Sequence, residues 1–175
     1  EQEESMKLIL SDKPIILPET GSDVKIVDLS RLQIRPCIGC FGCWTKTPGK
    51  CVIRDDAVRV YPLIARSRKI IYVSKVRYGS YDTVMKTMLE RAIPIQQAFI
   101  HLVQGETHHV QRQVNVKDAV MIGYGDLTME EQQVFRQLIE RNAKNMNFER
   151  WRVRFAIPEE LEQVVSEEVA AWERY

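Results

Sequence analysis

The residues most capable of chemistry in this sequence are four cysteines that fall within 15 consecutive positions: Cys37, Cys40, Cys43 and Cys51. Their spacing, C-x2-C-x2-C-x7-C, lets three sulfurs converge from one tight loop, and the fourth returns after a turn at Pro48-Gly49. Cubane iron–sulfur clusters are held by four thiolates of this kind. Gly39 and Gly42 allow the backbone to fold close to a cluster and to donate N–H groups to its sulfurs. The pattern therefore predicts a [4Fe–4S] cluster.

Two other interpretations of the cysteines stay open. Zinc also accepts four thiolates, although structural zinc sites usually join two separated pairs of cysteines. A thiol-rich loop without a metal, with or without one disulfide bond, is the other interpretation. The close spacing from Cys37 to Cys43 favours a cluster over zinc.

Composition and charge narrow the class of protein. The chain has 175 residues, enough for one domain, and its 25 basic and 24 acidic side chains give a net charge of +1. We therefore expect neither a nucleic acid nor an anionic membrane as a partner. No apolar run approaches the ~18–20 residues of a membrane span. The polar start, Glu1–Ser5, is unlike a secretory signal, and Met6 is a candidate natural start. We expect a cytoplasmic protein, in which thiols stay reduced.

Five short apolar runs have the composition of strands that are buried on both faces of a parallel sheet. They are Lys7–Leu10, Val24–Leu29, Ile70–Ser74, Ala98–Val103 and Asp118–Gly123. Helical stretches alternate with them at Asp55–Arg66, Ser80–Arg91 and Thr128–Asn147. Asp55 and Asp56 favour the start of the first helix, which Pro62 should kink or restart. Thr128-x-x-Glu131 is a capping box at the start of the last. This alternation predicts a doubly wound α/β fold.

The last part of the chain has its own strand and helix pattern. From Trp151 to Ile157 the large apolar residues alternate with Arg152, Arg154 and Ala156, which predicts a sixth strand. Pro158 suits the first position of a following helix. One apolar face of that helix consists of Leu161, Val164, Val165, Val169 and Trp172. We therefore divide the chain into a main domain at 6–147 and a strand–helix extension at 148–175. The extension is expected to pack on the same domain or on a partner subunit.

The connection between the first two predicted strands is unusually short. Parallel neighbours normally need a dozen or more residues that include a helix. Residues 11–23 contain Pro14, Pro18 and Gly21 and leave no room for a full crossover helix. As an extended chain they still reach about 43 Å, which is enough to cross. One patch of the sheet should therefore lack its usual helix, and the tail helix or a partner subunit is expected to cover it.

The segment Ile34–Asp56, which holds the cysteines, resembles a loop of the NADPH-dependent FMN reductase and iron–sulfur flavoprotein family. Members commonly have a similar cysteine loop that ends in Gly-Lys-Cys and an Asp-Asp pair. They then have a Ser-Pro-Val-Tyr-aromatic-Gly-Ser turn, to which Ser74–Ser80 is similar. The resemblance covers about residues 6–147. It implies a flavodoxin-like, doubly wound parallel five-stranded sheet of order 2-1-3-4-5, here without a full first crossover helix and with an extra C-terminal strand and helix. It also implies FMN at the C-terminal edge of the sheet.

The resemblance assigns candidate FMN contacts to three loops at that edge. The loop after the first strand would hold the phosphate with Ser11, Asp12 and Lys13. The loop after the third strand would touch the flavin ring with Lys75, Val76, Arg77, Tyr78 and Gly79. The loop after the last strand of the main domain would flank the pocket with Gly123, Tyr124, Gly125 and Asp126.

This chain departs from the family pattern in two of these loops. The family's phosphate loop is longer and opens a helix, whose N-terminal N–H groups suit a phosphate. Here that helix is missing, and Asp12 would repel the phosphate, with Lys13 as a partial compensation. In the ring-side turn, Lys75 and Arg77 replace the family's Pro and its usual Tyr.

Several aromatic side chains have two interpretations. Tyr78 could stack on a flavin ring or pack at a strand end. Trp44 follows Cys43 directly and could shield the cluster or serve the core or an interface. His108 and His109 lie in a polar loop, and we expect them to be surface residues without a metal.

These features together predict an FMN-dependent oxidoreductase or electron-transfer flavoprotein that is similar to NAD(P)H-dependent FMN reductases. NAD(P)H is the expected donor, and electrons would pass between FMN and the [4Fe–4S] cluster to a small-molecule or protein redox partner. The family implies a homodimer or homotetramer. The alternative, which the short connection at 11–23 supports, is a flavodoxin-like protein that has lost FMN and acts as a binding or assembly subunit.

Overall fold

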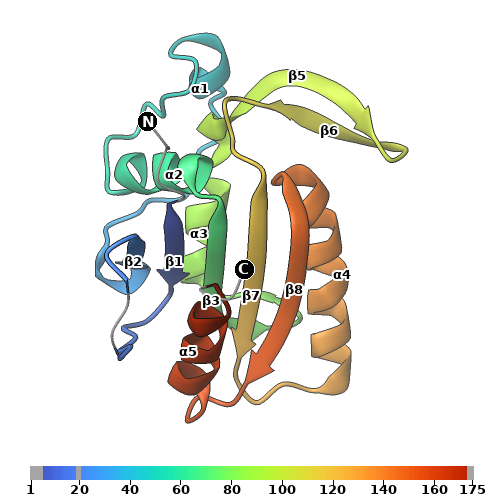
Figure 1. Ribbon diagram of the computed structural model, residues 1–175. Coiled ribbons are helices and arrows are strands. Elements are labelled where there is room, and N and C mark those ends of the chain that lie inside the picture. The colour runs from blue at the N-terminus through green and yellow to red at the C-terminus, as the bar shows by residue number, and fades with distance from the viewer. Residues whose placement is uncertain (1–5, 19–20, 173–175) are drawn as a thin grey trace.

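The computed structural model describes residues 6–18 and 21–172. Five parallel strands form one sheet in the order β2-β1-β3-β7-β8 (Figure 1). They are β1 (Lys7–Ser11), β2 (Val24–Asp28), β3 (Lys69–Arg77), β7 (Lys117–Tyr124) and β8 (Phe148–Ala156). A short strand, β4 (Ser80–Tyr81), pairs antiparallel with the end of β3. The predicted doubly wound α/β fold is confirmed, and the predicted strand order 2-1-3-4-5 matches in part, because its first three strands are those expected and its last two are not. The polar segment Glu1–Ser5 lies outside the described residues.

The predicted fourth strand, Ala98–Val103, is wrong as a member of this sheet. It lies in β5 (Gln96–Val103), which pairs with β6 (Glu106–Gln111) in a separate antiparallel hairpin that projects from the body of the protein (Figure 1). Gln104 and Gly105 both have positive φ at the tip, and such two-residue turns are typical of hairpins. β7 is therefore the fourth strand of the sheet, and β8, which was predicted as a sixth strand, is the fifth.

Three helices cover one face of the sheet: α2 (Ala57–Arg66), α3 (Thr83–Glu90) and α4 (Met129–Asn145). Their apolar sides meet the strands in a core that includes Leu8 and Phe135. α4 starts at the predicted capping box, in which Thr128 and Glu131 exchange side-chain and backbone hydrogen bonds. α2 runs through Pro62 as one helix, so the predicted restart does not occur.

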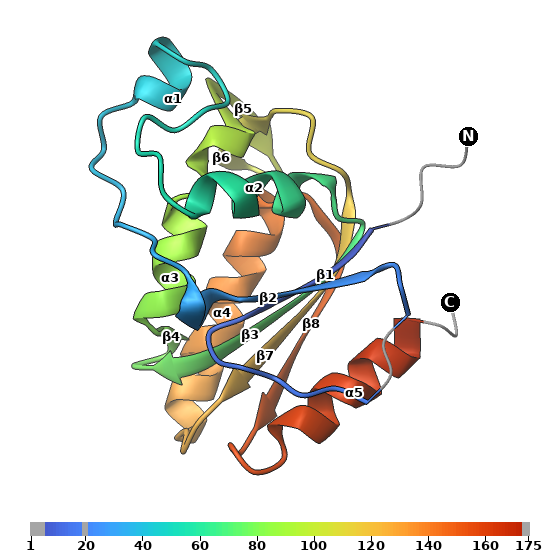
Figure 2. The same ribbon diagram turned by 90° about the vertical axis from the view of Figure 1, so that its left-hand side faces the viewer.

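The helix α5 (Leu161–Trp172) covers the opposite face (Figure 2). Leu161 and Trp172 pack against β1, β3 and β7 in a second core. The described residues of the first connection, 12–18 and 21–23, contain no helix, as predicted, and Leu17 joins the second core. The tail helix therefore supplies the expected cover for this face. The division of the chain after residue 147 stays a prediction.

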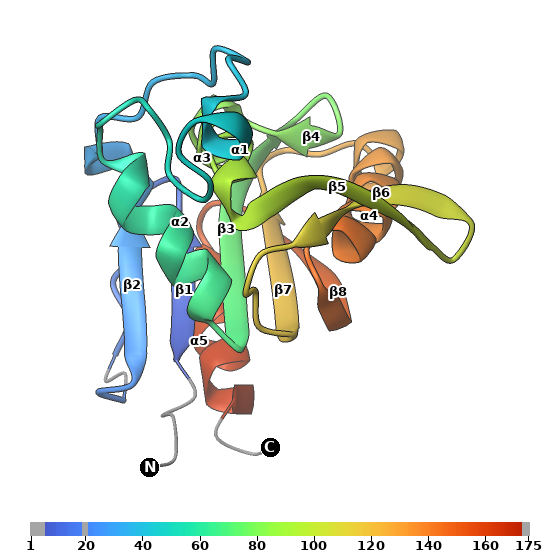
Figure 3. The same ribbon diagram turned by 90° about the horizontal axis from the view of Figure 1, so that it is seen from above.

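Three short helices complete the described elements: η1 (Leu29–Arg31), α1 (Gly42–Thr45) and η2 (Ile93–Ile95). α1 lies within the cysteine segment, beside the start of β5 (Figure 3). Within residues 6–18 and 21–172, none of the helices is long and apolar enough to cross a membrane.

Candidate functional site

The four cysteines line a single pocket on one segment, residues 35–53, which we call the cysteine loop. The pocket has a volume of about 50 Å³, and apolar side chains such as Ile38 and Val52 form other parts of its wall. The backbone adopts positive φ at Gly39 and Phe41, just before α1 begins. The loop therefore gathers the thiols around one small, largely apolar space.

The thiols differ in exposure. Cys37 and Cys40 are exposed, Cys43 and Cys51 are partly buried, and all four are free. Burial and, after it, the neighbouring Cys51 raise the pKa of the Cys43 thiol. In the part of the chain that the structure describes, no three His, Cys, Asp or Glu side chains are already arranged to hold a metal ion. The metal assignment of the cysteines therefore stays a prediction.

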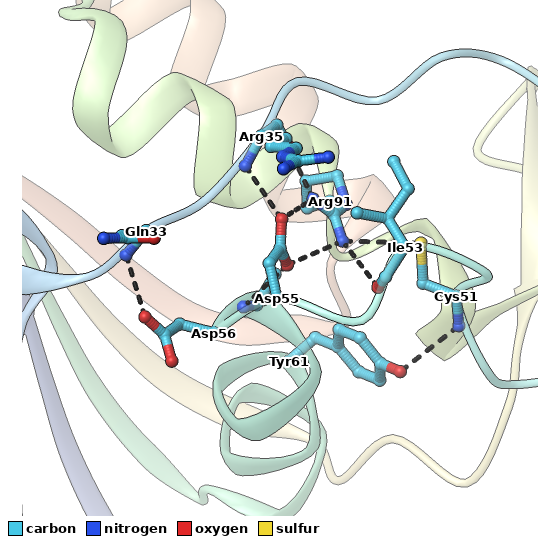
Figure 4. Close-up of polar contacts among 9 residues, drawn as sticks. Gln33, Arg35, Cys51, Ile53, Asp55, Asp56, Tyr61 and Arg91 are labelled. Carbon is cyan, nitrogen blue, oxygen red and sulfur yellow. Dashed lines mark hydrogen bonds and ion pairs between the residues drawn. The ribbon is translucent and has the colours of Figure 1, made fainter.

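A buried arginine closes the cysteine loop (Figure 4). Arg91 follows α3, its side chain is fully buried, and it pairs with both carboxylate oxygens of Asp55 at 2.7 and 2.9 Å. The same guanidinium donates to the carbonyl oxygens of Arg35 at 2.6 Å and Ile53 at 3.3 Å, and to Cys51 Sγ at 3.4 Å. Because Arg35 and Ile53 are the two ends of the loop, one side chain fixes both its entry and its exit. We call Arg91 and Asp55 the loop clamp.

The two aspartates before α2 reinforce this closure. Asp55 accepts hydrogen bonds from the backbone N–H groups of Arg35 and of the first residue of α2, and Asp56 accepts one from Gln33. Burial raises the pKa of Asp55, but the hydrogen bonds from Arg91 and Arg35 outweigh it and hold that pKa below its ordinary value. The predicted helix start at this pair is confirmed, and Asp55 has a second role in the clamp.

The cysteine loop also contacts the base of the β5–β6 hairpin. Trp44 Nε1 donates to Gln96 O at 3.0 Å, and the Trp44 ring centre lies 4.6 Å from that of His109. His108 pairs with Glu106 at 3.1 Å. Both histidines are partly buried in these contacts. The two histidines therefore lie on β6 rather than in a polar loop, and the expectation that they hold no metal stays a prediction.

The C-terminal edge of the sheet is organised by Asp12. Its carboxylate accepts hydrogen bonds from Lys75 N at 2.6 Å, Ser74 Oγ at 3.2 Å and Tyr124 OH at 2.8 Å. Burial raises the pKa of Asp12 despite these hydrogen bonds. Burial, and then the hydrogen bond to Asp12, also raise the pKa of Tyr124. These four residues, the Asp12 network, join the ends of β1, β3 and β7, where the FMN contacts were assigned.

The segment after β1 is closed by its own contacts. Ser11 is buried, and its hydroxyl donates to Lys13 O at 2.7 Å. The ammonium of Lys13 lies 5.7 Å from the centre of the Tyr124 ring, a cation–π distance. The predicted phosphate residues are thus brought together, but around Asp12 and without a helix N-terminus.

The ring-side turn is exposed at its tip and packed at its base. Its exposed residues are Lys75, Arg77 and Tyr78. Tyr78 N donates to Glu131 Oε1 at 3.0 Å, and Val76 is buried in the core. Gly79 has a φ of +72°, and a Cβ there would lie 2.6 Å from the side chain of Val134. The turn is therefore held tightly against α4.

The loop after β7 completes the edge. Gly123 and Tyr124 are buried, Gly125 is half-buried and Asp126 is exposed. A Cβ at Gly123 would lie 2.7 Å from the side chain of Val76, so these two positions face each other inside the fold. Of the assigned FMN residues, the structure thus gathers one group around Asp12: Ser11, Lys13, Lys75 and Tyr124.

Sequence reasoning missed two side chains of these sites. Arg91 was placed only at the end of a predicted helix, yet it falls three positions after the buried Met88, on the apolar side of α3. Charged side chains are almost never fully buried unless they are paired, so an arginine on the apolar side of a helix indicates an anionic partner nearby. Glu131 was assigned to the capping box alone, and it also holds the ring-side turn.

The cysteine loop and the Asp12 network lie at different ends of the molecule. In Figure 1, α1 is at the top, whereas the C-terminal ends of β7 and β8 are at the bottom. The two candidate sites are therefore built separately on the same sheet.

The order and parallel direction of the strands define a flavodoxin-like fold. An FMN-dependent NADH-azoreductase from Bacillus anthracis, in complex with FMN, matches with a TM-score of 0.58 and 13% identity over 97% of this chain and 98% of that one. An NAD(P)H:quinone oxidoreductase from Methanothermobacter marburgensis matches with a TM-score of 0.58 and 10% identity over 95% and 96% of the two chains. At such identities, these structures show the fold alone.

Sequence comparison identifies more specific relatives. An iron–sulfur flavoprotein from Methanocaldococcus jannaschii is 30% identical over 83 residues, which cover 47% of this chain and 42% of that protein. An iron–sulfur flavoprotein from Archaeoglobus fulgidus is 36% identical over 78 residues, which cover 45% of this chain and 34% of that protein. The predicted resemblance to iron–sulfur flavoproteins is thus confirmed. The match spans less than half of each relative, and no family model matches the chain.

Proposed function

We propose that the chain is an electron-transfer protein of the iron–sulfur flavoprotein type, in which Cys37, Cys40, Cys43 and Cys51 hold a [4Fe–4S] cluster. The observation that carries this proposal is the single pocket that all four cysteines line, in a loop clamped at both ends. Relatives named iron–sulfur flavoproteins support it. When bound, such a cluster supplies one-electron transfer.

The donor set of the cysteine loop fits an iron–sulfur cluster. Four thiolates are the usual ligands, and the surroundings of their sulfurs tune the cluster. Two N–H donors already lie close to ligand sulfurs: Gly39 N is 3.5 Å from Cys37 Sγ, and Arg91 Nη2 is 3.4 Å from Cys51 Sγ. The wall of the pocket is largely apolar, whereas Cys37 and Cys40 are exposed, so a cluster there would be partly open to solvent.

The Asp12 network does not fit the phosphate of FMN at the position that the resemblance assigns to it. Phosphates bind to free backbone N–H groups and to cations. Lys75 N already donates to the Asp12 carboxylate, and Tyr78 N donates to Glu131. FMN-dependent chemistry with NAD(P)H as donor therefore requires a phosphate site away from the Asp12 carboxylate, for which the exposed side chains of Lys75 and Arg77 are candidates.

The remaining parts of the proposal follow the sequence analysis and the relatives. As an oxidoreductase, the chain would pass electrons to a small-molecule or protein redox partner. It would work in the cytoplasm as a homodimer or homotetramer, without a nucleic acid or a membrane as partner.

The Asp12 network favours a second candidate function. A flavodoxin-like protein whose phosphate position is filled by its own carboxylate can serve as a binding or assembly subunit without FMN. In this case the cysteine loop would serve as part of a binding surface or would hold a metal without a flavin.

The test is an anaerobic reconstitution with iron and sulfide, followed by iron, sulfide, zinc and flavin analysis of the same sample. The wild type should hold about four iron atoms per chain and give a cluster signal in electron paramagnetic resonance after reduction. Cys43→Ala should lose iron, whereas Lys46→Ala, an exposed position in the same loop, should keep it.

The outcomes separate the two candidates. Unchanged iron content in Cys43→Ala, or zinc in place of iron, would overturn the cluster. FMN that copurifies with the cluster supports the flavoprotein. A wild type that holds neither iron nor FMN would overturn the oxidoreductase and leave the binding or assembly subunit.

A further inference from the structure

We propose that Arg91 positions Cys51 as a cluster ligand and raises the reduction potential of the cluster through its hydrogen bond to Cys51 Sγ. This inference rests on the proposed cluster and goes beyond it, because it gives a redox role to a residue outside the cysteine motif.

Arg91 is held in place from several sides. Its backbone N–H bonds to the carbonyl oxygens of Thr87 and Met88 at the end of α3, both at 3.1 Å. Its side chain is fully buried and meets the Asp55 carboxylate through two parallel hydrogen bonds. Such a paired, planar guanidinium is more rigid than a lysine ammonium. The position of the guanidinium beside Cys51 is thus set by α3 and Asp55.

The hydrogen bond to sulfur gives Arg91 an electronic effect. N–H donors stabilise the extra electron on a reduced cluster and so raise its potential. Arg91 Nη2 lies 3.4 Å from Cys51 Sγ. Asp55 acts in the opposite sense, because its negative charge lies against the guanidinium at 2.7 Å and offsets the positive charge. The two members of the clamp should therefore shift the potential in opposite directions.

The guanidinium also has one unused donor. Arg91 Nε is buried and has no hydrogen-bond partner among the described residues. A buried N–H without an acceptor costs free energy.

The variants Arg91→Gln and Asp55→Asn distinguish a redox role from a merely structural one. Arg91→Gln removes the positive charge and the paired hydrogen bonds of the guanidinium. We expect the equilibrium constant for one-electron reduction of the cluster to fall about tenfold, which equals a fall in potential of about 59 mV. Asp55→Asn should raise that constant. If Arg91→Gln does not fold, Arg91→Lys keeps the positive charge without the planar pair of N–H donors and should lower the potential by a smaller amount. Arg59→Gln, at an exposed ion pair with Asp56, is the matched control and should leave the potential unchanged.

The experiment is a redox titration of the reconstituted proteins, followed by electron paramagnetic resonance, with iron content measured on each sample. Opposite shifts for Arg91→Gln and Asp55→Asn support the proposal. Variants that retain iron but keep the wild-type potential, or that shift in the same direction, overturn it while the proposed cluster survives. A wild type without iron overturns the cluster itself, and this inference with it.

Discussion

The substitution Asp12→Asn should turn the C-terminal edge of the sheet from a position that repels a phosphate into one that accepts it. Asparagine keeps the shape of the side chain and most of its hydrogen bonds. Its carbonyl can accept from Lys75 N, and its amide can donate to the oxygen of Tyr124. The variant therefore removes the charge with little change in packing.

The size of the effect follows from the position of the carboxylate. Asp12 Oδ2 lies 2.6 Å from Lys75 N, so a phosphate that packs against this end of β3 must come within about 4 Å of the carboxylate. Two unit charges at that distance repel by about 4 kcal/mol at an effective dielectric constant of about 20. Partial exposure and salt reduce this to about 2–3 kcal/mol. FMN should therefore bind to Asp12→Asn about 30–150-fold more tightly than to the wild type.

The assay is a titration followed by quenching of flavin fluorescence, with riboflavin as the control ligand. Riboflavin has the same ring but lacks the phosphate, so its affinity should change by less than about threefold, within the range of a surface effect. Asp126→Asn, an exposed carboxylate at the same edge, is the control variant. The reasoning is refuted by an unchanged FMN affinity in Asp12→Asn, or by an equal gain for riboflavin.

The same substitution has a signature in the pH dependence of stability. Burial raises the pKa of Asp12 above its ordinary value of 3.8, so the folded state holds this proton more tightly than the unfolded state. The protonated Asp12 therefore stabilises the folded state fully below pH 3.8, and this contribution is lost as the pH rises through the pKa of the folded state. The free energy of unfolding, measured in urea at about pH 4 and about pH 7, should therefore rise in Asp12→Asn relative to the wild type as the pH increases. A stability difference that does not vary with pH would contradict the burial argument.

Three further substitutions test buried or tightly packed positions of the fold. Arg91→Met should lower the free energy of unfolding by about 3–5 kcal/mol, because the carboxylate of Asp55 stays buried without its partner. The exposed Arg59→Met should cost less than about 0.5 kcal/mol, and equal losses in urea unfolding would contradict the clamp. Lys117→Met should cost about 2–4 kcal/mol, since the buried Nζ of Lys117 donates to three backbone carbonyls. A Tm within about 2 °C of the wild type would count against that role. Gly79→Ala should cost about 2–4 kcal/mol, because its φ is +72° and a Cβ would lie 2.6 Å from a side chain of α4. A loss below about 1 kcal/mol in the same unfolding assay would mean that the turn moves away from the helix.

Much of the fold could be predicted because buried parallel strands leave a local signal. The runs at Lys7–Leu10 and Asp118–Gly123 are continuously apolar, since both faces of these strands are covered. The run at Ala98–Val103 has the same composition, but it lies in a projecting hairpin where Phe99 and Leu102 are exposed. Composition does not report which strand pairs with which, and only the turn at Gln104-Gly105 indicated the hairpin.

The candidate sites were predictable to the extent that their residues are close in sequence. The four cysteines lie in one short segment, so their spacing alone indicated a shared pocket. The loop clamp joins Asp55 to Arg91, 36 positions away, and no local pattern relates them. The Asp12 network depends on β1, β3 and β7 being neighbours in the sheet. The sequence indicated that Asp12 would repel a phosphate, but the three donors that hold it there come from tertiary structure.

The separation of the two sites makes their roles independently testable. The cysteine loop is held by Arg91 and Asp55, whereas the sheet edge is held by Asp12 with donors from β3 and β7, and the two sets of hydrogen bonds share no residue. Substitutions at distant sites without shared partners have additive effects. A change in the Asp12 network should therefore leave the architecture of the cysteine loop intact. If Asp12→Asn raises the affinity for FMN while the iron content and potential stay at their wild-type values, the cysteine loop functions without support from the C-terminal edge of the sheet. A change in potential on the same substitution would instead reveal a coupling that must pass through β3 and α3, the elements that connect the two ends.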